Sequence, residues 1–249
     1  MISVDGLSFN YANRKVLKDI TFSMGKGECL AILGTNGVGK STLLKCINRI
    51  LKQKNGKIAI QGENLHALSK RQLAQRLGYV SQSNSFSRST VFDAVLLGRK
   101  PYIKWDVTTK DLDIVHDVIA RLGLEDYSLR LVDELSGGEL QKVSIARALA
   151  QEPDILMFDE PTSNLDLKNQ LEVISIIKSI VTEKDISAIV TMHDLNLSIR
   201  FADKFLMFKD GKVFASGGME IMTTENIMQV YSVSVAIENY NDIPVIIPI

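Results

Sequence analysis

Residues 29–44 have the sequence CLAILGTNGVGKSTLL, and this stretch decides the fold. The run from Cys29 to Leu33 is continuously apolar, which predicts a strand buried on both faces of a sheet. From Lys40 onward apolar residues recur at helical spacing, which predicts a helix. A glycine-rich loop, residues 34–39, therefore connects a buried strand to the start of a helix.

This loop has the pattern of a phosphate-binding loop: Gly, four residues, Gly, Lys and Ser. Glycines allow successive backbone N–H groups to turn inward around phosphate oxygens, and the dipole of the following helix favours negative charge. We expect Lys40 to reach the β- and γ-phosphates of ATP, Ser41 to offer its hydroxyl to Mg²⁺, and Thr42 to donate near the α-phosphate. The expected phosphate-binding residues are Gly34, Thr35, Asn36, Gly37, Val38, Gly39, Lys40, Ser41 and Thr42.

A second motif supplies the acidic groups that a phosphate loop requires. The apolar run Ile155–Phe158 predicts a buried strand, and Asp159 follows at its carboxyl end, where open α/β sheets bind ligands. We expect Asp159 to hold Mg²⁺ through water and Glu160 to orient and deprotonate the attacking water. Apolar strands that end in Asp-Glu are common, and alone this one is equally well explained as a strand end. The phosphate loop favours the functional interpretation.

The rest of the sequence predicts an α/β fold with a phosphate-loop core, in one domain spanning residues 1–249. Three short runs near the N-terminus predict a small antiparallel sheet; they are Ile2–Phe9, Asp19–Met24 and Lys57–Ile60. Helical spacing over residues 84–150 predicts an inserted helical subdomain. Strands and helices then alternate, which indicates a mainly parallel sheet; the segments are Ile155–Phe158, Leu167–Val181, Ile186–Met192, Asp194–Phe201 and Phe205–Phe208.

Composition excludes several classes of function. Lys+Arg and Asp+Glu are 29 each, so the chain offers no net positive charge to nucleic acid, and we expect no nucleic-acid partner. The N-terminus lacks the pattern of a signal peptide, and no window approaches the roughly 18 consecutive apolar residues that span a bilayer. We therefore expect a cytosolic protein in which Cys29 and Cys46 are free thiols that serve in packing.

Residues 135–139, LSGGE, with QKVSIARAL at 141–149, resemble the signature motif of ABC ATPases. Ser136 and two glycines expose backbone N–H groups at the start of a helix, which is a second arrangement suited to phosphate. The resemblance implies that two chains enclose two ATP molecules head to tail, each signature completing the site of the opposite subunit. The residues implied are Ser136, Gly137, Gly138 and Glu139. A plain Ser N-cap is the alternative, but two following glycines lower helix stability.

Other positions match the ABC ATPase family in order along the chain. The resemblance implies that Gln82 contacts Mg²⁺ and water, and that His193 closes on the γ-phosphate. It also implies that Asp166 belongs to a loop, residues 163–166, that crosses to the opposite subunit, and that Tyr11 stacks on adenine. Alone, Gln82, His193 and Tyr11 are better explained as an exposed loop amide, a strand-end histidine and a hairpin residue; their order and company along the chain favour the functional interpretation. The implied catalytic residues are Glu160, His193 and Gln82, and the implied metal-binding residues are Ser41, Gln82 and Asp159.

Two positions depart from the family pattern: Thr35 stands where Pro is most frequent, and Leu140 where a polar residue is usual. Neither donates an essential group, because the loop binds phosphate mainly through backbone amides. The resemblance implies a homodimer of ATPase subunits on the cytoplasmic face of the membrane, bound to two permease subunits, with an extracytoplasmic substrate-binding protein acting indirectly. Alternatives are the ATPase of another importer or an exporter, a soluble non-transport ABC ATPase, or a binding-only subunit. Lys40, Glu160 and His193 argue against the last.

The segment Leu97–Tyr102, LGRKPY, resembles one in ATPases of iron–siderophore, haem and vitamin B12 importers, and a closing hairpin expected within residues 233–248 supports the same subgroup. The alternative is a helix stop with basic residues before Pro. We also expect the membrane partner to dock around Gln82–Tyr102, with Phe86 and Arg99 in that surface. The ATPase does not touch the cargo, so the sequence leaves the transported compound open.

Overall fold

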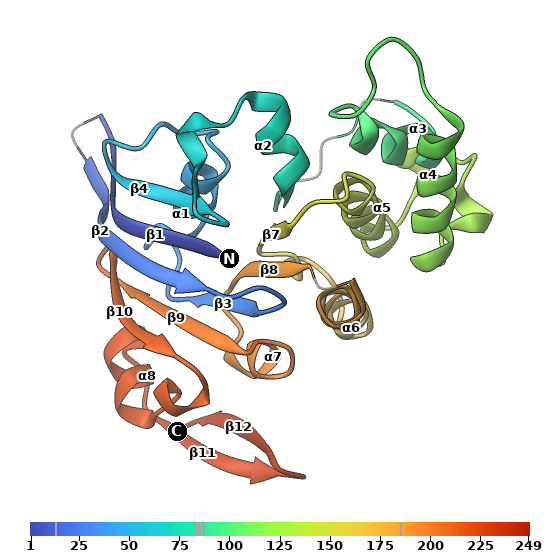
Figure 1. Ribbon diagram of the computed structural model, residues 1–249. Coiled ribbons are helices and arrows are strands. Elements are labelled where there is room, and N and C mark those ends of the chain that lie inside the picture. Colours follow the sequence, from blue (N-terminus) through green and yellow to red (C-terminus); the bar gives the residue numbers. More distant parts are fainter. Residues whose placement is uncertain (13, 83–85, 87, 185) are drawn as a thin grey trace. The chain divides into compact units, whose positions relative to one another are not determined.

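The computed structural model describes residues 1–12, 14–82, 86, 88–184 and 186–249 (Figure 1). These residues form two compact units. Unit 1 combines Met1–Leu68 with Ile177–Ile249, and unit 2 is Ser69–Ile176. Unit 1 is therefore built from both ends of the chain and unit 2 from its middle.

The first sheet of unit 1 is antiparallel, with the strand order β2-β1-β4-β5. Its strands are β1 (Ile2–Tyr11), β2 (Arg14–Met24), β4 (Asn55–Ile60) and β5 (Glu63–Asn64). Buried and exposed residues alternate at the start of β1, because one face packs on the core and the other faces solvent. This sheet confirms the N-terminal antiparallel subdomain that the sequence predicts.

The second sheet of unit 1 carries the phosphate loop. Its central strand β3 (Cys29–Leu33) runs parallel to β8 (Ser187–Met192) on one side and to β9 (Lys204–Lys209) on the other. All five residues of β3 are buried, as the continuous apolar run predicts. The antiparallel strand β10 (Lys212–Gly217) pairs with β9. Because β3 and β8 are parallel, the segments that follow them emerge at the same edge of the sheet.

Helices and a hairpin complete unit 1. They are α1 (Lys40–Ile47), η1 (Leu65–Ala67), α7 (Leu195–Ile199), η5 (Met219–Ile221), α8 (Thr224–Tyr231), β11 (Val235–Tyr240) and β12 (Ile243–Pro248). The antiparallel pair β11–β12 confirms the closing hairpin, and it packs against α7 and α8 (Figure 1). Cys29 and Cys46 are buried free thiols, as expected. The sequence analysis did not predict β10 or α8.

Unit 2 contains two parallel strands and most of the helices. Its elements are α2 (Lys70–Arg76), β6 (Leu77–Val80), α3 (Val91–Leu96), η2 (Leu97–Arg99), α4 (Thr109–Arg121), η3 (Glu125–Tyr127), η4 (Val132–Glu134), α5 (Gly137–Leu149) and β7 (Ile155–Asp159). The helix α6 (Leu167–Lys184) begins in unit 2 and ends in unit 1. Strand β6 pairs with β7, and α3 packs against α4 and α5. Among the residues described, no helix combines the length and apolarity needed to cross a bilayer.

Candidate active site

The phosphate loop, residues 34–39, needs glycine for its backbone path. Gly34, Gly37 and Gly39 have φ angles of 148°, 77° and 115°, which L side chains rarely adopt. A Cβ on Gly34 would also lie 2.7 Å from the carbonyl oxygen of Phe208 in β9. The loop therefore packs directly on the neighbouring strand, and Gly39 leads into the N-terminus of α1.

Lys40 lies within this loop. Its side chain is buried, and Nζ donates to the carbonyl oxygens of Gly34 at 2.7 Å and Thr35 at 3.2 Å. The ammonium group thus lies against the carbonyl groups of its own loop, within reach of an anion that the loop binds. Ser41 is half-buried and Thr42 is buried in the first turn of α1.

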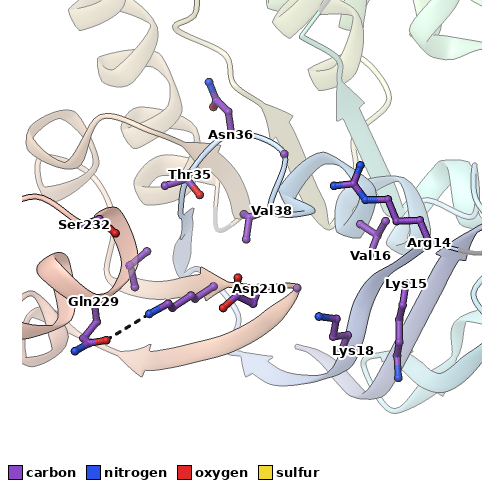
Figure 2. Close-up of a pocket in the computed structure, with 14 residues that line it drawn as sticks. Arg14, Lys15, Val16, Lys18, Thr35, Asn36, Val38, Asp210, Gln229 and Ser232 are labelled. Carbon is purple, nitrogen blue, oxygen red and sulfur yellow. Dashed lines mark hydrogen bonds between the residues drawn. The ribbon is translucent and has the colours of Figure 1, made fainter.

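A cavity of about 540 Å³ borders the loop in unit 1 (Figure 2). The loop residues Thr35 to Val38 form one side of the cavity, and the turn from β9 to β10 forms another. The Val38 side chain points from the loop into the cavity. Four basic side chains line it: Arg14, Lys15, Lys18 and Lys209. These residues were not predicted, although Arg14 and Lys15 stand at the start of β2 and give this edge a positive charge suited to a polyanion.

His193 and Tyr11 also belong to unit 1. His193 follows the last residue of β8 and lines a second cavity, of about 430 Å³, together with Gly34, Thr35 and Asn36. The structure therefore brings the predicted histidine to the phosphate loop. Tyr11, at the end of β1, is 46% exposed and packs edge-to-face on Phe9 with ring centroids 4.8 Å apart, so much of its ring is open to solvent.

The predicted carboxylates and Gln82 meet in unit 2. Gln82 Nε2 donates to Glu160 Oε2 at 2.8 Å, and the Tyr79 hydroxyl donates to Asp159 Oδ2 at 3.1 Å. Burial and the adjacent Asp159 carboxylate raise the pKa of Tyr79, so its hydroxyl stays protonated and donates. Tyr79 was not predicted as a site residue, because only the pairing of β6 with β7 brings it to Asp159.

Glu160 has an unusual backbone conformation. Its φ angle is 48°, in the left-handed region that few residues other than glycine adopt. The turn that follows is held by Ser163, whose Oγ donates to the Glu160 carbonyl at 2.8 Å. Such a conformation costs free energy and is concentrated at functional sites. Here it turns the chain sharply after β7, directly beyond Asp159.

The signature residues begin α5. Ser136 is the N-cap: its Oγ accepts from the Glu139 amide at 3.4 Å, and Glu139 Oε2 accepts from the Ser136 amide at 2.8 Å. The Ser136 hydroxyl, which donates to Glu139 Oε2 at 2.7 Å, and then the Ser136 amide lower the pKa of Glu139. A Cβ on Gly138 would lie 2.4 Å from Asn169 Oδ1, so glycine allows the starts of α5 and α6 to approach closely. Asp166 lies at that same place, because its Oδ1 accepts from the Asn169 amide at 2.8 Å.

The segment that was predicted to contact the membrane partner is less exposed in the structure than expected. Ser83, Asn84, Ser85 and Ser87 of this segment lie outside the described residues. Phe86 is half-buried, and the Arg147 guanidinium of α5 lies 4.6 Å from the centroid of its ring. Phe86 is therefore in part a packing residue.

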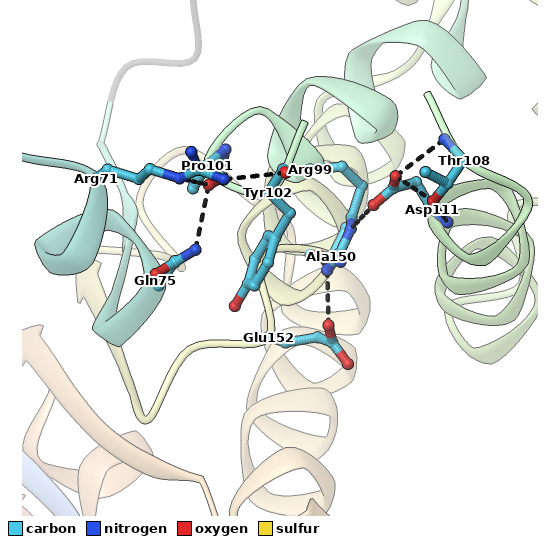
Figure 3. Close-up of polar contacts among 9 residues, drawn as sticks. All are labelled: Arg71, Gln75, Arg99, Pro101, Tyr102, Thr108, Asp111, Ala150 and Glu152. Atoms are coloured by element: carbon cyan, nitrogen blue, oxygen red, sulfur yellow. Dashed lines mark hydrogen bonds and ion pairs between the residues drawn. The ribbon is translucent and has the colours of Figure 1, made fainter. Parts of the chain in front are cut away.

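The expectation that Arg99 lies in an exposed surface is wrong. Its side chain is 2% exposed and lies inside unit 2 (Figure 3). Nε pairs with Asp111 Oδ1 at 2.9 Å, and Nη1 pairs with Glu152 Oε2 at 2.8 Å and donates to the Ala150 carbonyl at 2.7 Å. The guanidinium also lies 4.1 Å from the centroid of the Tyr102 ring. Arg99 is thus a buried structural cation that ties η2 to α4 and to the end of α5.

A phosphate loop on a parallel sheet, with an aspartate and a glutamate at the end of a second parallel strand, defines a nucleoside-triphosphatase cassette. The sequence family described as ABC transporter matches residues 17–163 of the chain. An uncharacterised ABC transporter ATP-binding protein of Methanocaldococcus jannaschii is 56% identical over 249 residues, covering 100% of this chain and 98% of the relative. The chain belongs to the ABC transporter family, and it is an ABC ATPase.

Relatives with named substrates differ in what they transport. A phosphonates import ATP-binding protein of Nitratidesulfovibrio vulgaris is 38% identical, covering 92% of this chain and 90% of the relative. A petrobactin import ATP-binding protein of Bacillus subtilis is 30% identical, with 97% of both chains covered. A solved structure of a metal-chelate type ABC transporter in an inward-facing conformation superposes with a TM-score of 0.87 at 30% identity, covering 100% of this chain and 96% of the other.

Proposed function

We propose that this chain is the ATP-hydrolysing subunit of a membrane importer of metal chelates, such as iron–siderophore, haem or corrinoid complexes. The observation that carries the hydrolytic role is the 2.8 Å contact between the Gln82 amide and the Glu160 carboxylate, one residue beyond Asp159. A carboxylate oriented by an amide in this way is suited to act as a general base on water. A binding-only cassette has no need of that arrangement.

In the proposed reaction, the amides of the phosphate loop and Lys40 bind the β- and γ-phosphates of ATP. Glu160 accepts the proton of the attacking water, and Gln82 fixes the orientation of the Glu160 carboxylate through its 2.8 Å hydrogen bond. His193 hydrogen-bonds to the γ-phosphate, which suits its place in the same cavity as the phosphate loop. Tyr11 offers its exposed ring to adenine.

The proposed metal-binding residues fit Mg²⁺. Ser41, Gln82 and Asp159 present hydroxyl, amide and carboxylate oxygens, and Mg²⁺ prefers oxygen ligands. When bound, Mg²⁺ supplies positive charge that offsets the charge developing on the transferred phosphoryl group. The Tyr79 hydroxyl, which donates to Asp159, holds that carboxylate in one orientation.

The proposed assembly is a homodimer on the cytoplasmic face of the membrane, with two permease subunits and, indirectly, an extracytoplasmic substrate-binding protein. Residues Ser136 to Glu139 of a second copy would complete each nucleotide site, because the capped start of α5 presents backbone amides suited to phosphate. The permease would contact the segment Gln82–Tyr102 through exposed side chains such as Leu97, which is 53% exposed, and not through Arg99.

The metal-chelate class is supported by the petrobactin relative, the metal-chelate type structure and the closing hairpin. The phosphonate relative makes an organophosphonate the second candidate, because its identity to this chain is higher. Uptake assays with the reassembled transporter, offering a ferric siderophore and a phosphonate in turn, distinguish the two.

The variant Glu160→Gln tests the hydrolytic role. It keeps the size of the side chain but removes the base, so we expect ATP binding to persist while turnover falls about 10²- to 10⁴-fold. Size-exclusion chromatography with light scattering should then show an ATP-trapped dimer with two nucleotides. Glu125→Gln, at an exposed position in η3, is the matched control and should hydrolyse ATP at the parental rate. Near-parental hydrolysis by Glu160→Gln would refute the assignment.

A further inference from the structure

The C-terminal part of unit 1 packs directly behind His193. Helix α7 begins two residues after His193, and its Asn196 pairs with Ile246 of the closing hairpin. Asn196 Nδ2 donates to the Ile246 carbonyl at 3.0 Å, and the Ile246 amide donates to Asn196 Oδ1 at 2.8 Å. The hairpin therefore fixes the chain just beyond His193 by two hydrogen bonds. Neither the phosphate-binding role nor the proposed base explains this arrangement.

Tyr231, the last residue of α8, lies between two cavities. The first, of about 430 Å³, contains the phosphate loop and His193. The second, of about 220 Å³, is mainly apolar; its lining includes Leu195, Ile227, Val233, Val235, Ile246 and Pro248. Tyr231 and His193 line both cavities. The Tyr231 ring thus separates the hairpin from the phosphate loop.

The Tyr231 hydroxyl oxygen is buried and makes no hydrogen bond with the part of the chain that the structure describes. Burial and the Asp194 carboxylate raise the pKa of Tyr231, and the Gly34 backbone amide, which faces the hydroxyl oxygen, opposes the rise, so the O–H proton is the part of the group that lacks an acceptor among the described residues. A buried hydroxyl without a partner destabilises a fold, and phenylalanine would fill the same space without that cost. The presence of tyrosine at this position is therefore best explained by a hydrogen bond that its hydroxyl forms when the nucleotide site is occupied.

We propose that Tyr231 is a positioning residue for ATP hydrolysis, whose hydroxyl hydrogen-bonds to the turn carrying His193 when that turn closes on bound nucleotide. This inference rests on the proposed function. The packing supports it, because the same hairpin contacts α8, which ends at Tyr231, through β11 and α7, which follows His193, through β12. Tyr231 acts through His193 and touches no reacting atom.

The test compares Tyr231→Phe with Tyr240→Phe, which removes a hydroxyl from a 72% exposed tyrosine of the hairpin. For Tyr231→Phe we expect kcat for ATP to fall about five- to tenfold, with the KM for ATP changed less than twofold, since binding and positioning are separate steps. Its thermal midpoint should equal or exceed the parental value, because the buried unpaired hydroxyl is gone. Tyr240→Phe should match the parent in all three quantities.

A second measurement reports on His193 itself. The chain has three histidines, and His66 and His116 are exposed and serve as internal references. In the nucleotide-bound protein, Tyr231→Phe should move the imidazole NMR signals of His193 and leave the other two in place. An unchanged kcat with an unchanged His193 signal overturns the inference alone. A parent protein that neither binds nor hydrolyses ATP overturns the proposed function as well.

Discussion

Lys40 and Arg99 are both buried cations, at 4% and 2% exposure, but their surroundings differ. Arg99 lies among groups that stay with it: the carboxylates of Asp111 and Glu152 and the ring of Tyr102. In unit 1, Lys40 donates to backbone carbonyls of its own loop. Those carbonyls belong to the phosphate loop, where phosphate oxygens can accept from Lys40 in their place, whereas two carboxylates hold the Arg99 guanidinium within the fold.

The difference shows that burial of a charge does not by itself identify a functional residue. Arg99 is enclosed by carboxylates of its own unit, while Lys40 lies on a loop whose glycines and backbone amides suit a bound anion. The comparison predicts three graded effects on stability, and each can be measured without a membrane partner.

The largest effect is expected for Arg99→Met. This change leaves the buried Asp111 carboxylate and the Ala150 carbonyl without the guanidinium, and removing one partner of a buried pair costs about 3–5 kcal/mol. Since whole domains are stable by roughly 5–15 kcal/mol, this loss is a large fraction of the total stability. Urea unfolding followed by circular dichroism measures the loss.

Arg130→Met is the matched control for that substitution. Arg130 also lies over a tyrosine, 4.9 Å from the centroid of the Tyr127 ring, but it is exposed. An exposed stacked cation contributes about 0.5–1 kcal/mol, so this variant should remain well folded. Equal losses for Arg99→Met and Arg130→Met would show that the ion pairs around Arg99 contribute little.

The second effect depends on pH and concerns Asp111. Hydrogen bonds from Thr108, followed by those from Arg99, lower the pKa of Asp111 in the folded state. The stabilisation is therefore complete above the ordinary Asp pKa of about 3.9 and is lost as pH falls through the lowered folded-state pKa. At neutral pH, Asp111→Asn should cost about 1–3 kcal/mol, the range for a hydrogen bond to a charged group.

Urea midpoints between pH 7 and pH 2.5 measure this dependence. The difference between the parent and Asp111→Asn should shrink as the pH falls, because the parent then also loses its charge. Asp113→Asn, at an exposed position of the same helix, should follow the parental curve. A difference that stays constant from pH 7 to pH 2.5 would assign the effect of Asp111→Asn to shape and not to charge.

Sequence alone predicted the parts of the fold that depend on neighbouring residues. The strand Cys29–Leu33, the loop and the following helix are specified by local pattern, and so is the strand that ends at Asp159. Strand β10 was missed because it is short and none of its six residues is buried, so its pattern is weak. Helix α8 was missed although Thr223 caps it, because only Ile227 and Val230 of its eight residues are buried, which leaves a weak apolar pattern.

The sequence pattern did not predict contacts between residues that lie far apart in the chain. The sequence analysis predicted Gln82 and Glu160 as site residues, but it did not predict their hydrogen bond, because 78 positions separate them. Arg99 was placed at the surface because it belongs to the segment Gln82–Tyr102 that was expected to contact the membrane partner. Its partners Asp111 and Glu152 lie 12 and 53 positions away, and only tertiary packing assembles that cluster.

The smallest effect on stability is expected for Lys40→Met, although it should abolish nucleotide binding. Lys40 Nζ donates to the Gly34 and Thr35 carbonyls, and an ordinary hydrogen bond contributes about 0.5–1.5 kcal/mol, so without nucleotide we expect the variant to lie within about 1 kcal/mol of the parent. ATP at 100 times its Kd stabilises the parent by about 2.7 kcal/mol and should leave the variant unchanged. Lys45→Met, at a half-buried position of α1, should keep the full response to ATP. Thermal unfolding with and without ATP measures the stability of the free protein and its stabilisation by ATP. If Lys40→Met without nucleotide lost as much stability as Arg99→Met, Lys40 would also be a structural cation.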